Sequence, residues 1–323
     1  MLYIGDGRMK GKSKKLATIY ISKKIITLVI VAIIVIVRPR ASENITQDSV
    51  VGDLKKSNAY NKYNKFFNNL QGSFIIPGLK TRMCPQGLCE TEDYILITAY
   101  DLTQKNNSCI YIIDKNSGKH LKTLWIGDNT THVGGITYDG SKYLYIANGF
   151  ESSISKIELD CIIRLDNDEY IYCDIINIAN DKGGNVRASF CSYDSKRDMV
   201  WVGIFNPVIG SNAYGYSINS NNKAKLKHVM EIPSFSQGMC FDNEYIYFSV
   251  SLGGFLPSKI YKCKYMSNKA NIIDSFTAPP GSENICINNG NMYILFESAA
   301  HQYYKGCIIP SFDPVDRVCI YDL

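Results

Sequence analysis

The sequence feature that most constrains the fold is a short motif that recurs about every fifty residues. Its clearest copy is Ser-Gln-Gly-Met-Cys-Phe-Asp at 236–242, followed by Tyr-Ile-Tyr-Phe-Ser at 245–249. The aligned positions of the five copies, which lie 48, 55, 48 and 46 residues apart, are Gly87, Gly135, Phe190, Gly238 and Asn284. This spacing is the period expected of a four-stranded propeller blade. The chain is therefore predicted to be an all-β propeller.

Each copy divides into short runs rich in aromatic and β-branched residues, separated by turn-forming residues such as those of 115–119. The predicted strands of the four complete copies are 87–90, 94–100, 109–114 and 121–126; 134–139, 143–148, 153–159 and 172–178; 188–194, 199–204, 213–218 and 226–232; and 238–242, 245–250, 258–264 and 272–276. An insertion at 160–170 explains the long second step.

The last copy ends early, which indicates how the ring closes. Its predicted strands are 284–288, 292–296 and 318–321, and a fourth strand is missing. An isolated strand at 73–76 precedes the first copy and has no partner there. If it pairs as the outer strand of the last blade, it removes the edges that an open sheet would expose. No sixth copy is found, so we predict a five-bladed β-propeller closed by this N-terminal strand.

The amino-terminal part is dominated by an apolar run. Residues 25–37 are apolar except for Thr27, and several lysines precede them. These 13 residues match the hydrophobic region of a signal peptide, whereas a full membrane span needs about 20. Counting 19–22 as well allows an uncleaved signal anchor. Either alternative gives an N-terminal hydrophobic helix and places the rest of the chain outside the cytoplasm, secreted or anchored to the cell membrane.

Three segments follow from these features. Residues 1–41 are a basic leader with the signal peptide or signal anchor, and residues 42–72 are a polar linker in which a short helix is expected near the end. Residues 73–323 form the propeller. Residues 1–40 hold nine basic and one acidic residue, so the remainder of the chain is slightly acidic. This distribution excludes nucleic acid as the propeller's partner, and we expect a monomer that contacts a membrane through the leader only.

Several of the 11 cysteines fall at repeat positions where small apolar side chains pack between blades. Shared positions are occupied by Cys89, Cys240 and Cys286 in the first strand and by Cys109 and Cys319 in the third. Cys84 and Cys89 flank a Pro-Gln-Gly segment and are candidates for a small disulfide ring. No metal site is predicted, because the sequence has no Cys-x-x-Cys pair and its four histidines lack zinc-site spacing.

The predicted site lies at the mouth of the axial channel, because the first strand of each blade lines that channel. The residues just before the aligned positions are Gln86, Gly134, Ser189, Gln237 and Glu283. His132 and Arg187 lie two residues further upstream and are expected to reach over the same mouth. We predict Glu283 as a general acid or base with His132 as its partner, and Arg187 as an anion clamp.

Further ligand contacts are predicted from Gln86, Ser189, Gln237 and Glu297. The competing interpretation is a water-filled channel whose polar groups satisfy one another. Residues that follow the second strands could add to the site. They are Tyr100, Asp101, Asn148 and Asn206, and the alternative interpretation is that each is a solvated strand end. The segment 297–304, with His301 and two tyrosines, either folds over the mouth or covers a blade edge.

Three functions remain open at this point. The first is an exported or membrane-anchored propeller that binds a small polar or carbohydrate-like ligand at the axial mouth. The second is an extracytoplasmic hydrolase or lyase that uses Glu283 and His132, and the third is a cell-surface scaffold for protein interaction. The residues do not identify a cofactor. A glycosidase is disfavoured because Glu283 is the one carboxylate placed at the axis by the repeat.

The motifs Gln-Gly-Met, His-Val-Gly-Gly, Gly-Ser-Glu and Met-Tyr-Ile-Leu-Phe-Glu-Ser-Ala-Ala resemble those of secreted bacterial β-propeller proteins with YVTN-like or quinoprotein-like repeats. The resemblance covers residues 85–305. It implies export and a propeller fold but brings no established activity. Asn284 departs from the pattern, since a glycine is usual there.

Overall fold

The computed structural model describes residues 61–207, 210–266, 268–304 and 311–323. The apolar run at 25–37, the rest of the predicted leader and most of the predicted linker lie outside these residues. No helix within the described residues is long and apolar enough to cross a membrane. The leader and the export that it implies therefore stay predictions.

The described residues form antiparallel groups of four strands. We call these groups units one to five. Unit one is β2 (Met83–Glu90), β3 (Tyr94–Asp101), β4 (Cys109–Asp114) and β5 (His120–Ile126), and unit two is β6 (Gly135–Tyr138), β7 (Tyr143–Ala147), β8 (Ser153–Glu158) and β10 (Asp174–Asn177). Unit three is β11 (Phe190–Asp194), β12 (Met199–Gly203), β13 (Ser211–Ile218) and β14 (Ala224–Ile232); unit four is β15 (Ser236–Asp242), β16 (Tyr245–Val250), β17 (Ser258–Met266) and β18 (Lys269–Ala278); and unit five is β19 (Ser282–Asn288), β20 (Asn291–Phe296), β21 (Arg317–Asp322) and β1 (Leu70–Ile75). Each group contains the strands predicted for one copy of the repeat, with small shifts at the ends.

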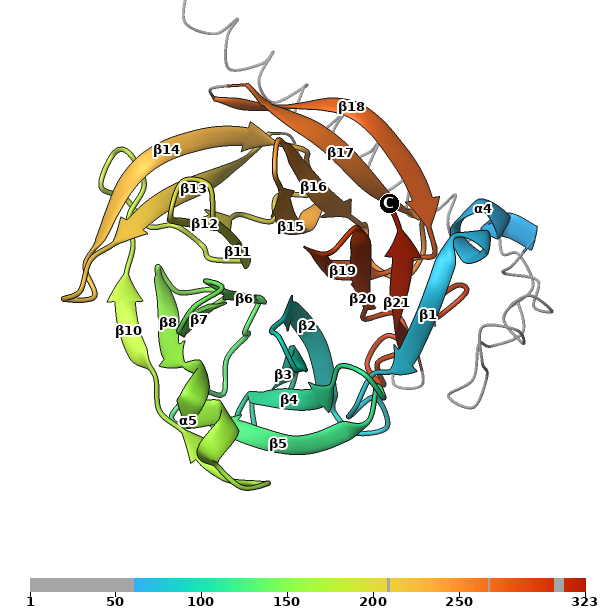
Figure 1. The fold of residues 1–323 in the computed structure, drawn as a ribbon, viewed down its shortest axis with the longest axis horizontal. Coiled ribbons are helices and arrows are strands. Elements are labelled where there is room, and N and C mark those ends of the chain that lie inside the picture. Colours follow the sequence, from blue (N-terminus) through green and yellow to red (C-terminus); the bar gives the residue numbers. More distant parts are fainter. Residues whose placement is uncertain (1–60, 208–209, 267, 305–310) are drawn as a thin grey trace, which may run out of the picture. The chain divides into compact units, whose positions relative to one another are not determined.

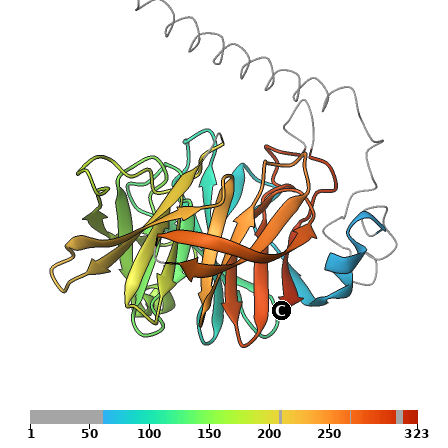
Figure 2. The same cartoon turned by 90° about the horizontal axis from the view of Figure 1, so that it is seen from above.

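The first strands of the units lie around a common centre (Figure 1). Contacts between neighbouring first strands run from β2 to β6, β6 to β11, β11 to β15, β15 to β19 and β19 back to β2. The fourth strands lie at the periphery, and the loops gather at the two ends of the strands (Figure 2). Residues about fifty positions apart in the sequence are thereby brought to one centre.

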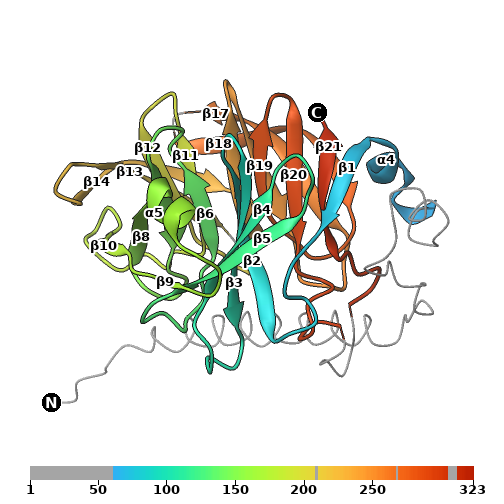
Figure 3. The same ribbon diagram turned by 60° about the horizontal axis from the view of Figure 1, so that its bottom comes forward.

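The pairing of β1 with β21 confirms the strand exchange predicted for the last copy. Phe74 lies opposite Val318 and Ile75 lies opposite Arg317 in this antiparallel pair. The short helix α4 (Asn64–Asn68), which confirms the helix expected near the end of the linker, lies next to β1 (Figure 3). Its Phe66 is 1% exposed and stacks against Phe276 and Tyr321. The N-terminal end of the described chain therefore anchors itself to strands at the opposite end of the sequence.

The insertion at 160–170 connects two units. It contains helix α5 (Leu159–Arg164) and leads into β9 (Tyr170–Ile171), which pairs in parallel with β5 of unit one. A second connection joins units three and four, where β14 and β18 meet at the pair Glu231 and Lys269. The side chains of that pair also form an ion pair at 3.1 Å. Both connections lie on outer strands.

The repeated glycines lie where neighbouring first strands come closest. A Cβ atom added to Gly87 would lie 2.6 Å from the backbone nitrogen of Ile136, and one added to Gly135 would lie 2.8 Å from that of Cys191. Side chains are excluded at such distances from backbone atoms. The glycine of the motif is therefore required by the packing of one unit against the next.

The cysteines within the described residues are free thiols. Cys89 and Cys240 are buried in the core, as their repeat positions predicted, and Cys286 packs against the same core cluster as Cys89. The disulfide ring considered for Cys84 and Cys89 is not present. Instead, the thiol of Cys84 lies 3.7 Å from the carboxylate oxygen Oε2 of Glu297.

We predict that Phe66→Ala lowers the free energy of unfolding by about 3–5 kcal/mol, because it removes a fully buried ring from between α4 and unit five. Urea denaturation followed by tryptophan fluorescence measures the change. The neighbouring Lys65 is exposed, so Lys65→Ala is the matched control and should change the free energy by less than about 0.5 kcal/mol. An equal effect of the two substitutions would show that α4 does not support the ring of strands.

Candidate functional site

The candidate site is a cavity of about 380 Å³ at one end of the axis. Its lining residues are Gln86, Tyr100, His132, Gly149, Phe150, Arg187, Ser189, Phe205, Pro207, Gln237, Glu283, Glu297 and Tyr303. All seven residues predicted from the sequence as catalytic or ligand-binding are among them. A cavity of this size is within the range of small-molecule sites.

The antiparallel strand order explains why these residues meet. A first strand begins where the second strand of the same unit ends, so both ends lie on the same face of the ring. Gln86, Gln237 and Glu283 lie near the beginnings of first strands, and Tyr100 and Glu297 lie at or just after the ends of second strands. The cavity is therefore built from equivalent positions of different units.

Two buried carboxyl groups form the polar floor. Glu283 and Glu297 are each 5% exposed. The Oε2 atom of Glu297 accepts a hydrogen bond from Nε2 of Gln86 at 3.1 Å and lies next to the thiol of Cys84. The Oε2 atom of Glu283 is buried and has no hydrogen-bond partner among the described residues. The two carboxyl groups therefore have different surroundings.

Burial determines the protonation of this pair. Loss of solvation and the neighbouring charge of Glu297 raise the pKa of Glu283 well above its usual range. Loss of solvation also raises the pKa of Glu297, to about 7, although contacts with Gln86, Cys84 and Tyr303 favour its charged form. Because the two groups interact, Glu297 loses its proton first, and the pair then has one proton, on Glu283, and one negative charge, on Glu297, as the pH rises above about 7.

Asn284 is a buried residue of β19 and directly follows Glu283 of the floor. It stands where three other copies of the repeat have glycine, and it is 1% exposed. Its Oδ1 accepts a hydrogen bond from the backbone of Ile285, and its side chain packs against Gly135 and Gly238, while its Nδ2 has no partner within the described residues. The departure from the repeat pattern at this position thus fills the space that the glycines leave open.

The cavity wall is aromatic. The ring of His132 lies 4.7 Å from that of Tyr100 and 5.9 Å from that of Phe150, measured between centroids. Gly149 makes this packing possible, because a Cβ atom there would overlap the backbone and side chain of His132. Phe150 is 59% exposed, and the guanidinium of Arg187 lies 4.2 Å from its ring centre. Arg187 is thereby held at the entrance of the cavity by a cation–π contact.

His132 is kept neutral. Burial and the cation of Arg187 lower the pKa of its imidazole to about 4. Its Nδ1 is buried without a hydrogen-bond partner in the described part of the chain, and no hydrogen bond joins it to Glu283. The sequence-based prediction of His132 as the partner of Glu283 stays untested. Burial raises the pKa of Glu283 most, and the charged group that adds to this rise is Glu297.

The remaining sequence candidates separate into lining and structural residues. Tyr100 lines the cavity, whereas Asp101 accepts hydrogen bonds from Thr103 and Asn106 within its own loop. Asn148 exchanges hydrogen bonds with Ser153 and Ser155. Asn206 donates a hydrogen bond to the backbone of Gly210. These contacts give the three residues structural roles, but Asp101 and Asn148 are buried, so they are not the solvated strand ends of the alternative interpretation.

The segment after β20 contributes lining residues to the cavity, which agrees with the first of the two alternatives considered for it. Tyr303 lines the cavity and contacts Glu297, whereas His301 is exposed. Phe150, Phe205 and Tyr303 were not predicted as site residues from the sequence. Two of them could have been found in the sequence, because Phe205 and Phe150 are aromatic residues two or three positions after the end of a second strand. Ser189 supports this wall, since its hydroxyl accepts a hydrogen bond from the backbone of Phe205.

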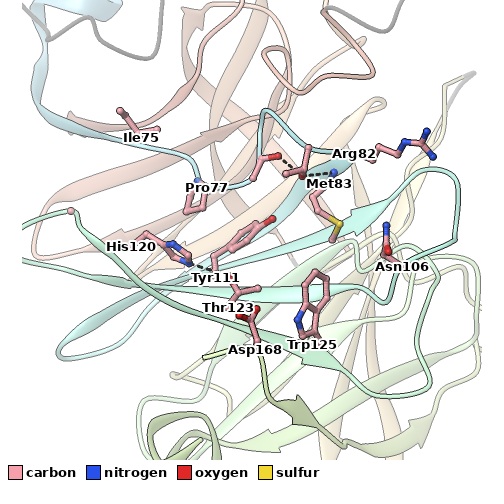
Figure 4. A pocket seen from close by; sticks show the side chains of 13 residues that line it. Ile75, Pro77, Arg82, Met83, Asn106, Tyr111, His120, Thr123, Trp125 and Asp168 are labelled. Atoms are coloured by element: carbon pink, nitrogen blue, oxygen red, sulfur yellow. Dashed lines mark hydrogen bonds between the residues drawn. The ribbon is translucent and has the colours of Figure 1, made fainter. Parts of the chain in front are cut away.

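A second cavity of about 780 Å³ lies away from the axis (Figure 4). It is bounded by the segment after β1 and by β4 and β5, and it contains Tyr111, Trp125 and His120, which is 3.2 Å from the hydroxyl of Thr123. Its lining carboxylate, Asp168, is exposed to solvent. We therefore take the axial cavity, where carboxyl groups are buried, as the candidate site. The described residues hold no cluster of potential metal ligands.

We predict that His132 makes stability depend on acid pH. Its lowered pKa means that the unfolded chain binds the proton more tightly, so stability is full above about 6.5 and falls as the pH drops toward about 4. The difference in pKa corresponds to at most roughly 3 kcal/mol. Urea denaturation at several pH values should show a flatter acid limb for His132→Phe than for the unchanged protein. Arg187→Gln should shift the limb in the same direction by a smaller amount, and an unchanged limb in His132→Phe would contradict the assignment.

No protein-family model and no curated protein sequence matches this chain. Among solved structures, glutaminyl cyclase from Myxococcus xanthus is similar, with a TM-score of 0.52 and 8% identity over 79% of this chain and 96% of that chain. The PQQ-bound aldose sugar dehydrogenase from Streptomyces coelicolor has a TM-score of 0.45 and 10% identity over 74% of this chain and 94% of that chain. At these identities the likeness concerns the fold alone. Together with the strand order, the likeness to the glutaminyl cyclase shows an all-β fold of the propeller type.

Proposed function

We propose that the chain is a closed five-bladed propeller whose axial mouth binds a small polar ligand, and that Glu283 and Glu297 transfer protons to and from that ligand. One observation carries the proposal. A carboxyl oxygen of Glu283 is buried without a partner in the described structure, in the wall of an open cavity and beside a second buried carboxyl group. A buried polar atom without a partner costs about 1–3 kcal/mol, and a ligand atom in the cavity would relieve that cost.

The surroundings assign different roles to the two carboxyl groups. Glu297 receives hydrogen bonds that favour its charged form, so it is the general base. Glu283 keeps its proton near neutral pH and is the general acid. In one turnover Glu297 takes a proton from the attacking group and Glu283 gives its proton to the leaving group. The pair still holds one proton afterwards, now on Glu297, and transfer back to Glu283 restores the starting state.

This assignment modifies the hydrolase or lyase mechanism predicted from the sequence. His132 remains in the site, but its low pKa makes it a neutral imidazole that contributes ring packing and hydrogen bonding. The similar glutaminyl cyclase indicates one reaction to test, in which an amine displaces ammonia from a carboxamide. Such a reaction requires one group that removes a proton from the amine and one that protonates the leaving nitrogen. The Glu283 and Glu297 pair has both forms available at the same pH.

We also propose that the propeller acts outside the cytoplasm as a monomer, secreted or anchored through residues 1–41. The apolar run at 25–37, the lysines before it and the slightly acidic remainder of the chain support this location. Cell fractionation of the full chain carrying a C-terminal tag would test it. Tag found wholly in the cytoplasm would refute the location without bearing on the carboxyl pair.

We predict that NMR of the protein labelled with [δ-¹³C]glutamate shows one glutamate that titrates near pH 7 and a second that stays protonated above it. Glu297→Gln should remove the first signal and lower the pKa of Glu283, because the charge that raises it is gone. Glu283→Gln should leave the pKa of Glu297 nearly unchanged, since it replaces a neutral group with a neutral group. Two glutamates that both titrate in the ordinary range would refute the shared proton.

We predict that Glu283→Gln and Glu297→Gln each lower turnover by at least about 100-fold. The probe is L-glutaminyl-2-naphthylamide, assayed for ammonia release and for naphthylamine release. Glu244→Gln, which changes an exposed glutamate on another turn, is the control and should keep full activity. Ammonia or naphthylamine release at an unchanged rate in both site variants would show that the carboxyl pair is not catalytic.

A further inference from the structure

The axial cavity has opposite charges at its two ends. The floor carries the single negative charge of the Glu283 and Glu297 pair, and the guanidinium of Arg187 lies at the entrance. Arg187 is exposed and forms no ion pair or hydrogen bond within the described residues, so its donors are free for a ligand. A ligand with a positive end and a negative end would match this arrangement in one orientation. This inference rests on the function proposed above.

The floor favours a cation. Oε2 of Glu283 is buried and unpartnered, whereas Oε2 of the neighbouring Glu297 accepts hydrogen bonds from Gln86 and from the thiol of Cys84. Both glutamates also have oxygen atoms that can accept further hydrogen bonds. An ammonium group brings three donors and one positive charge, and it would neutralise the buried charge. Tyr100 and Tyr303 line the same cavity, and aromatic side chains can attract cations.

The entrance favours an anion. The guanidinium carbon of Arg187 lies 4.2 Å from the ring centre of Phe150, and the side chain is exposed, which leaves its N–H donors available. A guanidinium edge matches the geometry of a carboxylate, with two parallel N–H donors. Lining residues near the entrance add the hydroxyl of Ser189 and the amide of Gln237, and neither is charged. A carboxylate at the entrance would therefore meet one cation and no competing anion from the lining residues.

We propose that the ligand is a small zwitterion, an amino acid or a short peptide, bound with its ammonium group on the Glu283 and Glu297 floor and its carboxylate on Arg187. The neutral His132 ring and Phe150 pack along the apolar part between these ends. An orientation with the carboxylate inward would place two negative charges together in a buried site, and the charge of Glu297 disfavours it.

The test is isothermal titration calorimetry of the full chain with ligands of stepped length. The zwitterions are glycine, 4-aminobutanoate, 6-aminohexanoate and glycylglycine, and the single-charge controls are butylamine and butanoate. We expect at least one zwitterion to bind at least about tenfold more tightly than either control. The length that binds best distinguishes a free amino acid from a peptide. Zwitterions that bind no better than butylamine would refute the proposal.

Variants then assign the two ends. Arg187→Gln should weaken binding of the best zwitterion by about tenfold or more and leave butylamine unaffected. Glu297→Gln should weaken both the zwitterion and butylamine, and Lys182→Gln, which changes an exposed cation on the same loop, should weaken neither. Equal effects of the two cation variants would remove Arg187 from the site. If the NMR titration shows the shared proton while the zwitterions fail to bind, this inference fails and the proposed proton transfer stands.

Discussion

The close contact between neighbouring first strands is the constraint on which the rest of this structure depends. At Gly87 and Gly135 the backbone of the next first strand lies where a Cβ atom would be. The ring can therefore be narrow, and the residue before each aligned position reaches the same end of the axis. Gln86, Gln237 and Glu283 come together for this reason, although Gln237 lies about 150 residues after Gln86 and Glu283 lies 46 residues after Gln237.

Most of the architecture could be predicted from the sequence because the packing requirement is repeated. The glycine, the run of aromatic and β-branched residues after it, and the missing fourth strand of the last copy were all visible in the sequence. The pairing of β1 with β21 follows from them, since an unpaired outer edge at β21 would otherwise face solvent. The pairing of β9 with β5 could not be predicted, because it involves two residues of an insertion that occurs in one unit.

The location of the site could be predicted, but the chemistry within it could not. Register determines which residues face the axis, so Glu283, His132 and Arg187 were found by position. The pKa of each group depends instead on burial and on contacts across units, such as that of Gln86 with Glu297. Glu297 follows a second strand and was therefore predicted as a ligand contact, whereas its burial beside Glu283 makes it the second member of the carboxyl pair. The aromatic wall was missed because loop residues have no repeat position.

The distribution of unsatisfied polar atoms connects the fold to the proposed function. Buried polar groups in folded proteins nearly always have hydrogen-bond partners. Among the described residues, buried polar atoms without a partner also occur away from the axis, as at Nε1 of Trp201. Three of them, Oε2 of Glu283, Nδ1 of His132 and Nδ2 of Asn284, belong to the axial cavity or to the position next to it. Each such atom lowers stability, and a low pKa for His132 adds a further penalty in acid. Apolar side chains at these positions would pack the axis at no such cost. Under the proposed function these atoms would be hydrogen-bond partners for a ligand, so the stability that they cost would be recovered as binding free energy.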